Sequence, residues 1–162
     1  MTATDIKNLL DVIPGSPVGL RDRAIILTLT LTGRRRSEVL NLTAKDLNQE
    51  GEAIFYSYRG KGGKHGKREL PQPAPLAIQQ ALEAFGKDFA TMIPEESLWP
   101  SSADSGRGII SGTFYGNLRR YFRMAGLPPA GVHIFRHSAA KLRREAGESI
   151  EQVSRFLDHS SL

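Results

Sequence analysis

Apolar residues recur at helical spacing over most of the chain, and this pattern sets the expected architecture. A strongly apolar stretch over 20–32 predicts a buried helix, which Gly33 is placed to end. A short helix is expected over 37–42, with Ser37 as its N-cap. Amphipathic patterns predict further helices over 4–12, 73–85, 113–125, 132–146 and 149–157.

One segment departs from the helical pattern, about one third of the way along the chain. The aromatic-rich residues 53–58 predict a strand, and 68–71 predict the strand that returns beside it. The Gly- and Lys-rich residues 59–67 between them then form the turn of a hairpin. Residues 98–101 are expected to make a buried turn, followed by a glycine-rich surface loop. The expected fold class is therefore mainly α with a small antiparallel β-sheet (α+β).

The chain has 162 residues, which favours a single domain. It has no cysteine, which excludes disulfides, thiolate metal sites and a cysteine nucleophile, and fits a reducing cytosol. It has no long apolar run that could span a membrane, and its start does not match a secretory signal. We therefore expect a cytoplasmic protein without a membrane partner.

The distribution of charge is more informative than its sum. The formal net charge is +5, which many soluble domains approach. The basic residues, however, cluster over 34–36, 59–68, 119–123 and 141–144, whereas acidic residues gather elsewhere, as over 145–151. Segregated positive charge favours a polyanionic partner, and nucleic acid is the usual one.

The arginine triplet after the apolar helix is the first candidate site. Gly33 lets the chain turn sharply between two predicted helices, and Arg35 follows directly after that turn. An arginine there can direct a rigid, permanently charged fork at two phosphate oxygens. Arg34 and Arg36 are alternatives for this role, and a solvated basic helix end is the alternative for all three. Glu38 is expected to orient the arginine or hold the helix rather than touch a substrate.

Histidines and a second arginine follow in the last third of the chain. His133 and Arg136 lie three positions apart on one predicted helix and therefore share a face. Arg136 offers charge and a fork to an oxyanion, and His133 offers a hydrogen bond or a proton-transfer group. His137 is expected to be a buried structural histidine. His159 follows the last predicted helix and is the remaining candidate.

The hairpin tip supplies the last candidate group. A lysine at the tip, Lys61 with Lys64 as its competitor, could reach a nucleic-acid groove and protonate a leaving oxygen. The glycine spacing there does not match a P-loop. No cofactor is expected, and no metal site, because the neighbouring histidines lie beside arginines and lack carboxylates. The candidates for nucleic-acid contact are Arg34, Arg36, Arg59, Lys64, Lys67 and Lys141.

These pieces, in this order, resemble the catalytic domain of the tyrosine recombinase (phage integrase) family. The resemblance is carried by 32–38 (Thr-Gly-Arg-Arg-Arg-Ser-Glu), 133–137 (His-Ile-Phe-Arg-His) and 157–162 (Leu-Asp-His-Ser-Ser-Leu), with the hairpin between the first two. The chain departs from the family pattern at Arg34, where an apolar residue is usual. It departs again at Asp158, where glycine is usual.

The resemblance implies DNA strand cleavage and rejoining without metal or added energy. In this family a tyrosine attacks the scissile phosphate, forms a 3′-phosphotyrosine bond and frees a 5′ hydroxyl, and a second strand's hydroxyl reverses the step. The resemblance implies that Arg35, Arg136 and His159 stabilise the phosphate oxygens. It further implies that His133 assists proton transfer from the tyrosine and that Lys61 protonates the leaving group.

The family spacing places the tyrosine after His159 and beyond Leu162. Residues 1–162 are therefore expected to be a catalytic domain, truncated at its C-terminus and separated from an N-terminal core-binding domain. The resemblance also implies double-stranded DNA as partner, a homotetramer on DNA when full length, and a bacterial, nucleoid-associated location. Two other functions stay open: a non-catalytic DNA-binding or regulatory domain of the same fold, and the less favoured type IB topoisomerase. The target site and biological role stay open as well.

Overall fold

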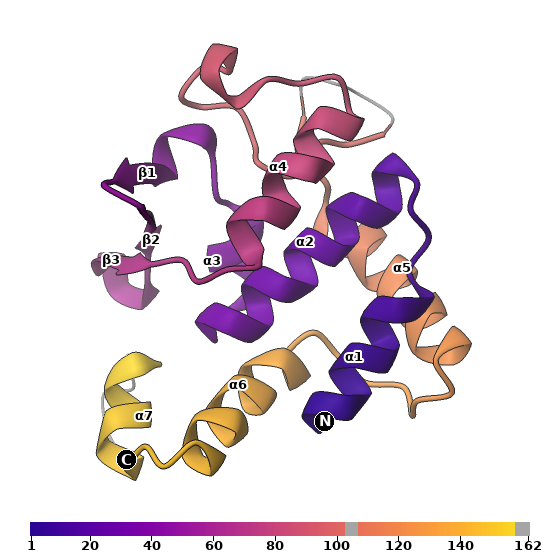
Figure 1. Ribbon diagram of the computed structural model, residues 1–162, viewed down its shortest axis with the longest axis vertical. Helices are drawn as coiled ribbons and strands as arrows, with labels where there is room; N and C mark the ends of the chain where they lie inside the picture. The colour runs from indigo at the N-terminus through magenta and orange to yellow at the C-terminus, as the bar shows by residue number, and fades with distance from the viewer. Residues whose placement is uncertain (103–106, 158–162) are drawn as a thin grey trace.

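The computed structural model describes residues 1–102 and 107–157. These residues form a mostly helical fold with one small antiparallel sheet (Figure 1), which confirms the predicted fold class. The helices are α1 (Ala3–Val12), α2 (Pro17–Thr32), α3 (Arg36–Leu40), α4 (Ala74–Ala84), α5 (Ser111–Met124), α6 (Ile134–Glu145) and α7 (Ile150–Phe156). The strands are β1 (Leu47–Glu50), β2 (Ala53–Arg59) and β3 (His65–Glu69), and short 3-10 turns are η1 (Ala44–Asp46), η2 (Lys61–Gly63) and η3 (Phe89–Thr91).

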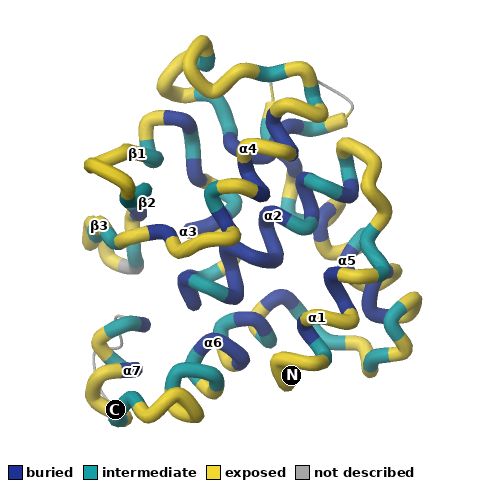
Figure 2. The backbone as a smooth tube through the Cα atoms, viewed as in Figure 1, coloured by how far each residue is buried: buried dark blue, intermediate teal, exposed yellow. Residues whose placement is uncertain are grey.

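Helix α2 is the centre of the fold. It is buried around most of its circumference, and it packs most extensively against α4 and α6 (Figure 2). Its start is fixed by Ser16, whose Oγ accepts the Gly19 N–H at 3.2 Å, and by Pro17 in the first turn. Across the described ranges, no helix combines the length and apolar composition that crossing a bilayer requires.

The sheet is a three-stranded antiparallel meander in the order β1–β2–β3. Tyr56 and Tyr58 on β2 are buried, and their rings lie 5.5 Å apart. Because alternate residues of a strand share a face, both tyrosines direct the inner face of the sheet toward the core. The β2–β3 hairpin closes where the Gly60 N–H donates to the Lys64 carbonyl, at 2.5 Å.

The structure differs from the predicted elements at three places near the site. Strand β1 was not predicted, because three of its four residues are exposed and it lacks an apolar alternation. Strand β3 begins at His65, earlier than predicted, because His65 pairs with Arg59 in the ladder. Helix α3 begins before Ser37, with Arg35 rather than Ser37 as its N-cap, because the Glu38 carboxylate accepts the Arg35 N–H.

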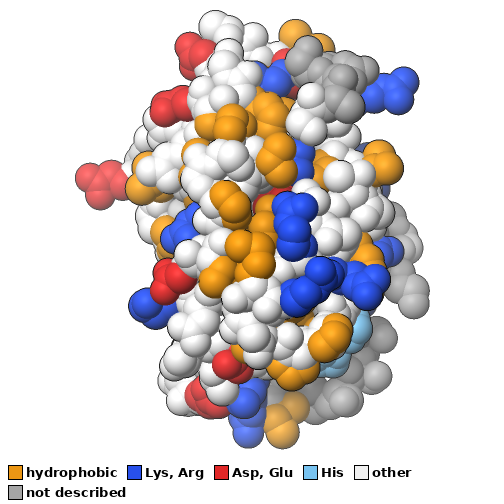
Figure 3. All heavy atoms as spheres, turned by 90° about the vertical axis from the view of Figure 1, so that its right-hand side faces the viewer, with side chains coloured by type: hydrophobic (Ala, Val, Ile, Leu, Met, Phe, Trp, Pro, Cys, Tyr) orange, Lys and Arg blue, Asp and Glu red, His pale blue; other side chains and the backbone are white. Residues whose placement is uncertain are grey.

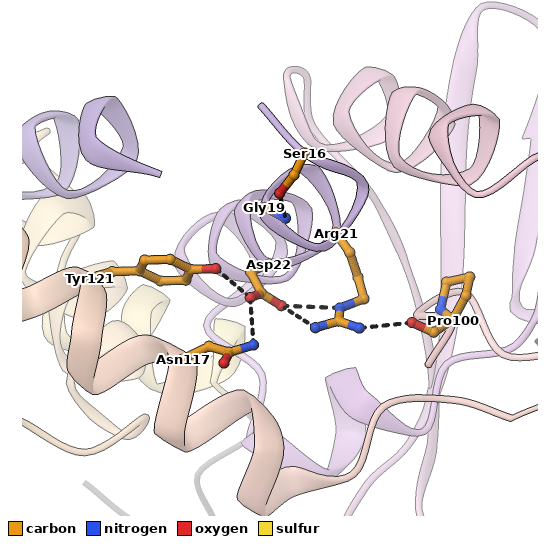
Figure 4. A network of polar contacts seen from close by, with 7 residues as sticks. All are labelled: Ser16, Gly19, Arg21, Asp22, Pro100, Asn117 and Tyr121. Atoms are coloured by element: carbon orange, nitrogen blue, oxygen red, sulfur yellow. Dashed lines mark hydrogen bonds and ion pairs between the residues drawn. The ribbon is translucent and has the colours of Figure 1, made fainter. Parts of the chain in front are cut away.

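A buried polar network fixes α2 against α5 and the 98–101 turn (Figure 4). Asp22 accepts from Arg21 through one carboxylate oxygen, and from Asn117 and the Tyr121 hydroxyl through the other. Arg21 also donates to the Pro100 carbonyl at 2.9 Å. Both charges are buried, and burial together with the Asp22 hydrogen bond raises the pKa of Tyr121. Tyr121 is therefore a structural residue.

We expect Tyr121→Phe to lower the free energy of unfolding by about 1.5–3 kcal/mol, because a buried carboxylate loses a hydrogen-bond donor. Urea unfolding at neutral pH measures this change. Tyr115→Phe is the matched control, since Tyr115 lies on the same helix but is 40% exposed. An equal, small effect of the two substitutions would contradict the importance of the network.

Tyr56→Phe, by contrast, should leave the free energy of unfolding at neutral pH unchanged within about 0.5 kcal/mol. The reason is that the buried Tyr56 hydroxyl has no hydrogen-bond partner among the described residues. Burial raises the pKa of Tyr56 to about 12 from its ordinary value of 10.0. The wild type should therefore lose stability as pH rises through 10 toward 12, whereas Tyr56→Phe should lose less. Urea unfolding at neutral and alkaline pH separates these outcomes, and identical alkaline losses would contradict the shift.

Candidate active site

The site is built around the turn that ends α2. Gly33 has left-handed backbone angles (φ 64°, ψ 12°), and its N–H donates to the Leu29 carbonyl at 3.0 Å. A Cβ at this position would lie 2.7 Å from Leu157 Cδ2 and 3.0 Å from the Phe156 ring. It would also lie 3.4 Å from Ala139 on α6. Gly33 therefore marks the point where α2, α6 and the end of α7 meet.

Arg35 follows the turn as the N-cap of α3, with its side chain 41% exposed. Its guanidinium lies 3.7 Å from Glu38 Oε1, which also accepts the Arg35 N–H at 3.0 Å. As expected, Glu38 holds the arginine and the helix start together. The other oxygen, Oε2, is buried without a hydrogen-bond partner among the described residues, close to Gly60 at the hairpin. Arg35 thus lies at the start of α3, held by Glu38, with its charge accessible to solvent.

Arg136 connects the segments that the sequence placed far apart. Its guanidinium donates to the Gly33 carbonyl at 2.5 Å and to the Leu157 carbonyl at 2.7 Å. The first bond ties α6 to the Arg35 turn, and the second ties α6 to the end of α7. Both candidate arginines therefore belong to one small region, although they lie far apart in the sequence.

His133 lies at the start of α6 and is exposed. Its ring makes an edge contact with His137, at a centroid separation of 5.8 Å and an interplanar angle of 89°. The expectation that His137 is buried is wrong: it is exposed, because the helix periodicity places it on the same outer face as His133. In the described ranges, no three His, Asp or Glu side chains are grouped to hold a metal ion.

Arg34 does not point outward with its neighbours. It is buried, its guanidinium lies 4.4 Å above the Tyr58 ring, and it donates to the Phe156 carbonyl. The prediction that Arg34 contacts DNA, or replaces Arg35 at a phosphate, is therefore at odds with this structure. The physical reason is that Arg34 occupies the inner side of the turn, where the apolar residue expected from the family pattern would pack.

The hairpin tip carries the candidate lysines. Lys61 belongs to η2, but its side chain lies outside what the structure describes. Lys64 and Arg59 are exposed on either side of the tip. Beside them runs a groove with a volume of about 530 Å³, whose lining is predominantly basic: Tyr58, Lys64, His65, Gly66, Lys67, Arg68 and Arg155.

The remaining predicted DNA contacts are exposed. Arg36 lies in the first turn of α3, Lys67 pairs with Glu50 across the sheet, and Lys141 lies 4.0 Å from Glu145 on α6. Positive charge also extends beyond the site. Figure 3 shows Lys and Arg side chains gathered on the face formed by α1 and α5, away from the hairpin.

Comparison with known proteins agrees with this geometry. The model of the phage integrase family matches residues 1–162, the whole chain. The chain belongs to the phage integrase family. Tyrosine recombinase XerA of Pyrococcus furiosus is 34% identical over 162 residues, covering 100% of this chain and 54% of that protein. Tyrosine recombinase XerA of Thermococcus kodakarensis is 33% identical over 164 residues, with the same coverage of 100% and 54%.

Solved structures show the same fold. A XerH site-specific recombinase bound to difH substrate has a TM-score of 0.80 at 23% identity, covering 99% of this chain and 47% of that one. A XerA recombinase crystal structure has a TM-score of 0.80 at 22% identity, covering 99% and 55%. This phage integrase family member thus spans about half the length of the curated relatives it matches.

We assign none of the tyrosines of this chain as the counterpart of the family's nucleophilic tyrosine. Tyr56, Tyr58 and Tyr121 are buried in the core, and Tyr115 lies on the exposed side of α5. His159 lies outside the described residues.

Sequence reasoning missed the residues that hold α7 in place. The guanidinium of Arg143 lies 3.4 Å from the centre of the Phe156 ring, and that of Arg68 lies 5.9 Å from the same ring centre. Arg68 also donates to the Arg155 carbonyl at 3.0 Å and to the Tyr58 hydroxyl at 3.1 Å. An available signal was the departure from the family pattern at Arg34, which indicated an altered environment beside the turn.

We expect Gly33→Ala to lower the free energy of unfolding by about 2–5 kcal/mol. About 1–2 kcal/mol comes from the left-handed backbone, and about 1–3 kcal/mol from the clash with Leu157 and Phe156. Urea unfolding of Gly33→Ala and of the wild type measures the total loss.

Gly51→Ala is the matched control. Gly51 has the same φ of 64° but open space around it, so only the backbone cost should remain. Equal losses in the two variants would mean that the end of α7 does not press against Gly33.

Proposed function

We propose that this chain is the catalytic domain of a site-specific DNA recombinase, which cleaves and rejoins duplex DNA through a 3′-phosphotyrosine intermediate. The observation that carries the proposal is the pair of hydrogen bonds from Arg136 to Gly33 and Leu157. Through them, the Arg35 turn, α6 and the end of α7 converge. The family membership and the curated recombinases it resembles support the same reaction.

Two arginines at one site suit the charge that develops during phosphoryl transfer. Attack on the scissile phosphate places negative charge on its non-bridging oxygens, and guanidinium groups held in advance stabilise that charge. Arg136 is held by two backbone carbonyls, and Arg35 by Glu38. We assign these two arginines to the non-bridging oxygens, with His159 as a further hydrogen-bond donor.

Proton transfer needs groups at opposite ends of the reacting bond. His133 is exposed beside Arg136, where its imidazole could accept a proton from an incoming tyrosine hydroxyl. Lys61, with Lys64 as competitor, is assigned to the departing 5′ oxygen from the hairpin tip. The nucleophilic tyrosine is proposed to lie in the protein beyond Leu162.

The DNA partner is supported by the surface around the site. The exposed candidates Arg36, Arg59, Lys64, Lys67 and Lys141, with the basic groove beside the hairpin, are suited to phosphates of the DNA backbone. Structural neighbours of this fold are recombinases bound to DNA. We further propose a homotetramer on DNA for the full-length protein and a bacterial, nucleoid-associated location.

We expect Arg35→Ala to reduce the rate of covalent DNA cleavage about 10²–10³-fold, because one preorganised oxyanion donor is lost. The substitution suits this test better than Arg136→Ala, since Arg136 also holds the backbone at Gly33 and Leu157. The assay measures the protein–DNA adduct on a nicked suicide substrate, using the longest reading frame that contains the chain.

Arg119→Ala is the matched control, because it removes an equal charge from the exposed face of α5. Its cleavage rate should stay near that of the wild type. Cleavage by Arg35→Ala at the wild-type rate would contradict the assignment of Arg35 to the phosphate oxygens. Salt-dependent duplex binding without any covalent adduct in the wild type would instead favour the second candidate, a non-catalytic DNA-binding domain.

A further inference from the structure

Arg34 contacts two segments that are distant in sequence. Its guanidinium lies 4.4 Å from the centre of the Tyr58 ring and 5.9 Å from that of the Phe156 ring, and it donates to the Phe156 carbonyl. Tyr58 lies on β2 next to the tip of the hairpin, and Phe156 ends α7. A single buried side chain therefore contacts both the hairpin, beside its tip, and the end of the last helix.

The contact to the Phe156 carbonyl has a specific role at that helix end. The last carbonyls of a helix have no partner within the helix and carry its negative partial charge. Arg34 donates a hydrogen bond to the Phe156 carbonyl, and Arg136 donates one to the next carbonyl, that of Leu157. Two arginines from different segments thus satisfy consecutive carbonyls at the end of α7.

We propose that Arg34 is a positioning residue, which seats the end of α7 against Tyr58 of the hairpin and the Gly33 turn. This inference rests on the proposed function, because the three segments it joins are those that carry Arg35, Lys61 and His159. Arg34 itself is buried and meets protein groups rather than substrate. Its effect on catalysis is therefore exerted through the placement of its neighbours.

The chemistry of arginine suits this role better than an apolar residue or lysine. A planar guanidinium can stack on an aromatic ring and at the same time donate in its own plane to a carbonyl. Leucine would keep packing volume but lose both polar contacts. Lysine would keep the charge but lose the planar stack on Tyr58.

The first test measures amide hydrogen exchange of this chain without DNA. In Arg34→Leu and Arg34→Lys, the amides of 153–157 should exchange at least tenfold faster than in the wild type. The amides of 24–29 in α2 should keep their protection, which shows that the variants remain folded. Unchanged protection over 153–157 in both variants would overturn the proposal.

Arg36→Leu is the matched control from the same arginine triplet, because Arg36 is exposed. It should leave exchange over 153–157 unchanged and lower the salt dependence of duplex DNA binding by about one phosphate contact. Arg34→Leu should speed exchange over 153–157 and leave the salt dependence of duplex DNA binding unchanged. A reduced salt dependence in Arg34→Leu, with normal α7 protection, would make Arg34 a DNA ligand and overturn the proposal.

The second test separates binding from turnover in the longest reading frame that contains the chain. At saturating nicked substrate, Arg34→Leu should cleave at least tenfold more slowly, while its DNA affinity changes less than threefold. If Arg34→Leu cleaves the substrate at the wild-type rate, the positioning role is overturned. If the wild type forms no adduct, the proposed recombinase function fails, whereas the exchange measurement still decides whether Arg34 seats α7.

Discussion

The arrangement of the site depends on the close approach between the Gly33 turn and the end of α7. Only a residue without a Cβ leaves room there for Leu157 and Phe156, and only a left-handed turn ends α2 in this direction. Arg136 then bonds the carbonyls on both sides of that contact. Packing and hydrogen bonding act on the same few atoms, so displacement of either segment disturbs both.

The fold places a notable part of its positive charge inside rather than on the surface. Arg21 and Arg34 are only 1% and 2% exposed, and burial of an unpaired charge would cost several kcal/mol. Arg21 is matched by the Asp22 carboxylate, whereas Arg34 is matched by a carbonyl and aromatic rings. Asp22 and Glu38 are buried as well, so the buried charges cancel, and the identity of each buried arginine matters more than the number of arginines.

The helices and the hairpin followed from sequence because their signals are local. Apolar spacing located α2, and glycine marked its end; the aromatic strand and the Gly/Lys turn located the hairpin. The motif around Arg35 and Arg136 could be recognised as a pattern, but their shared geometry could not, because it depends on carbonyls contributed by Gly33 and Leu157. The inward direction of Arg34 was not predicted, although the apolar residue that is usual at this position in the family pattern is a sign of a buried side chain.

Helix α7 shows why local signals are insufficient at this site. It has seven residues, and a helix this short is not stable in water by itself, even with the Ser149–Gln152 capping box. Its position therefore comes from tertiary contacts: the burial of Val153 and Leu157, and the contacts made from other segments by Arg34, Arg68, Arg136 and Arg143. These partners come together only when α2, α6 and the sheet have already packed. It follows that α7 owes its place to the packed core around it rather than to its own helical propensity.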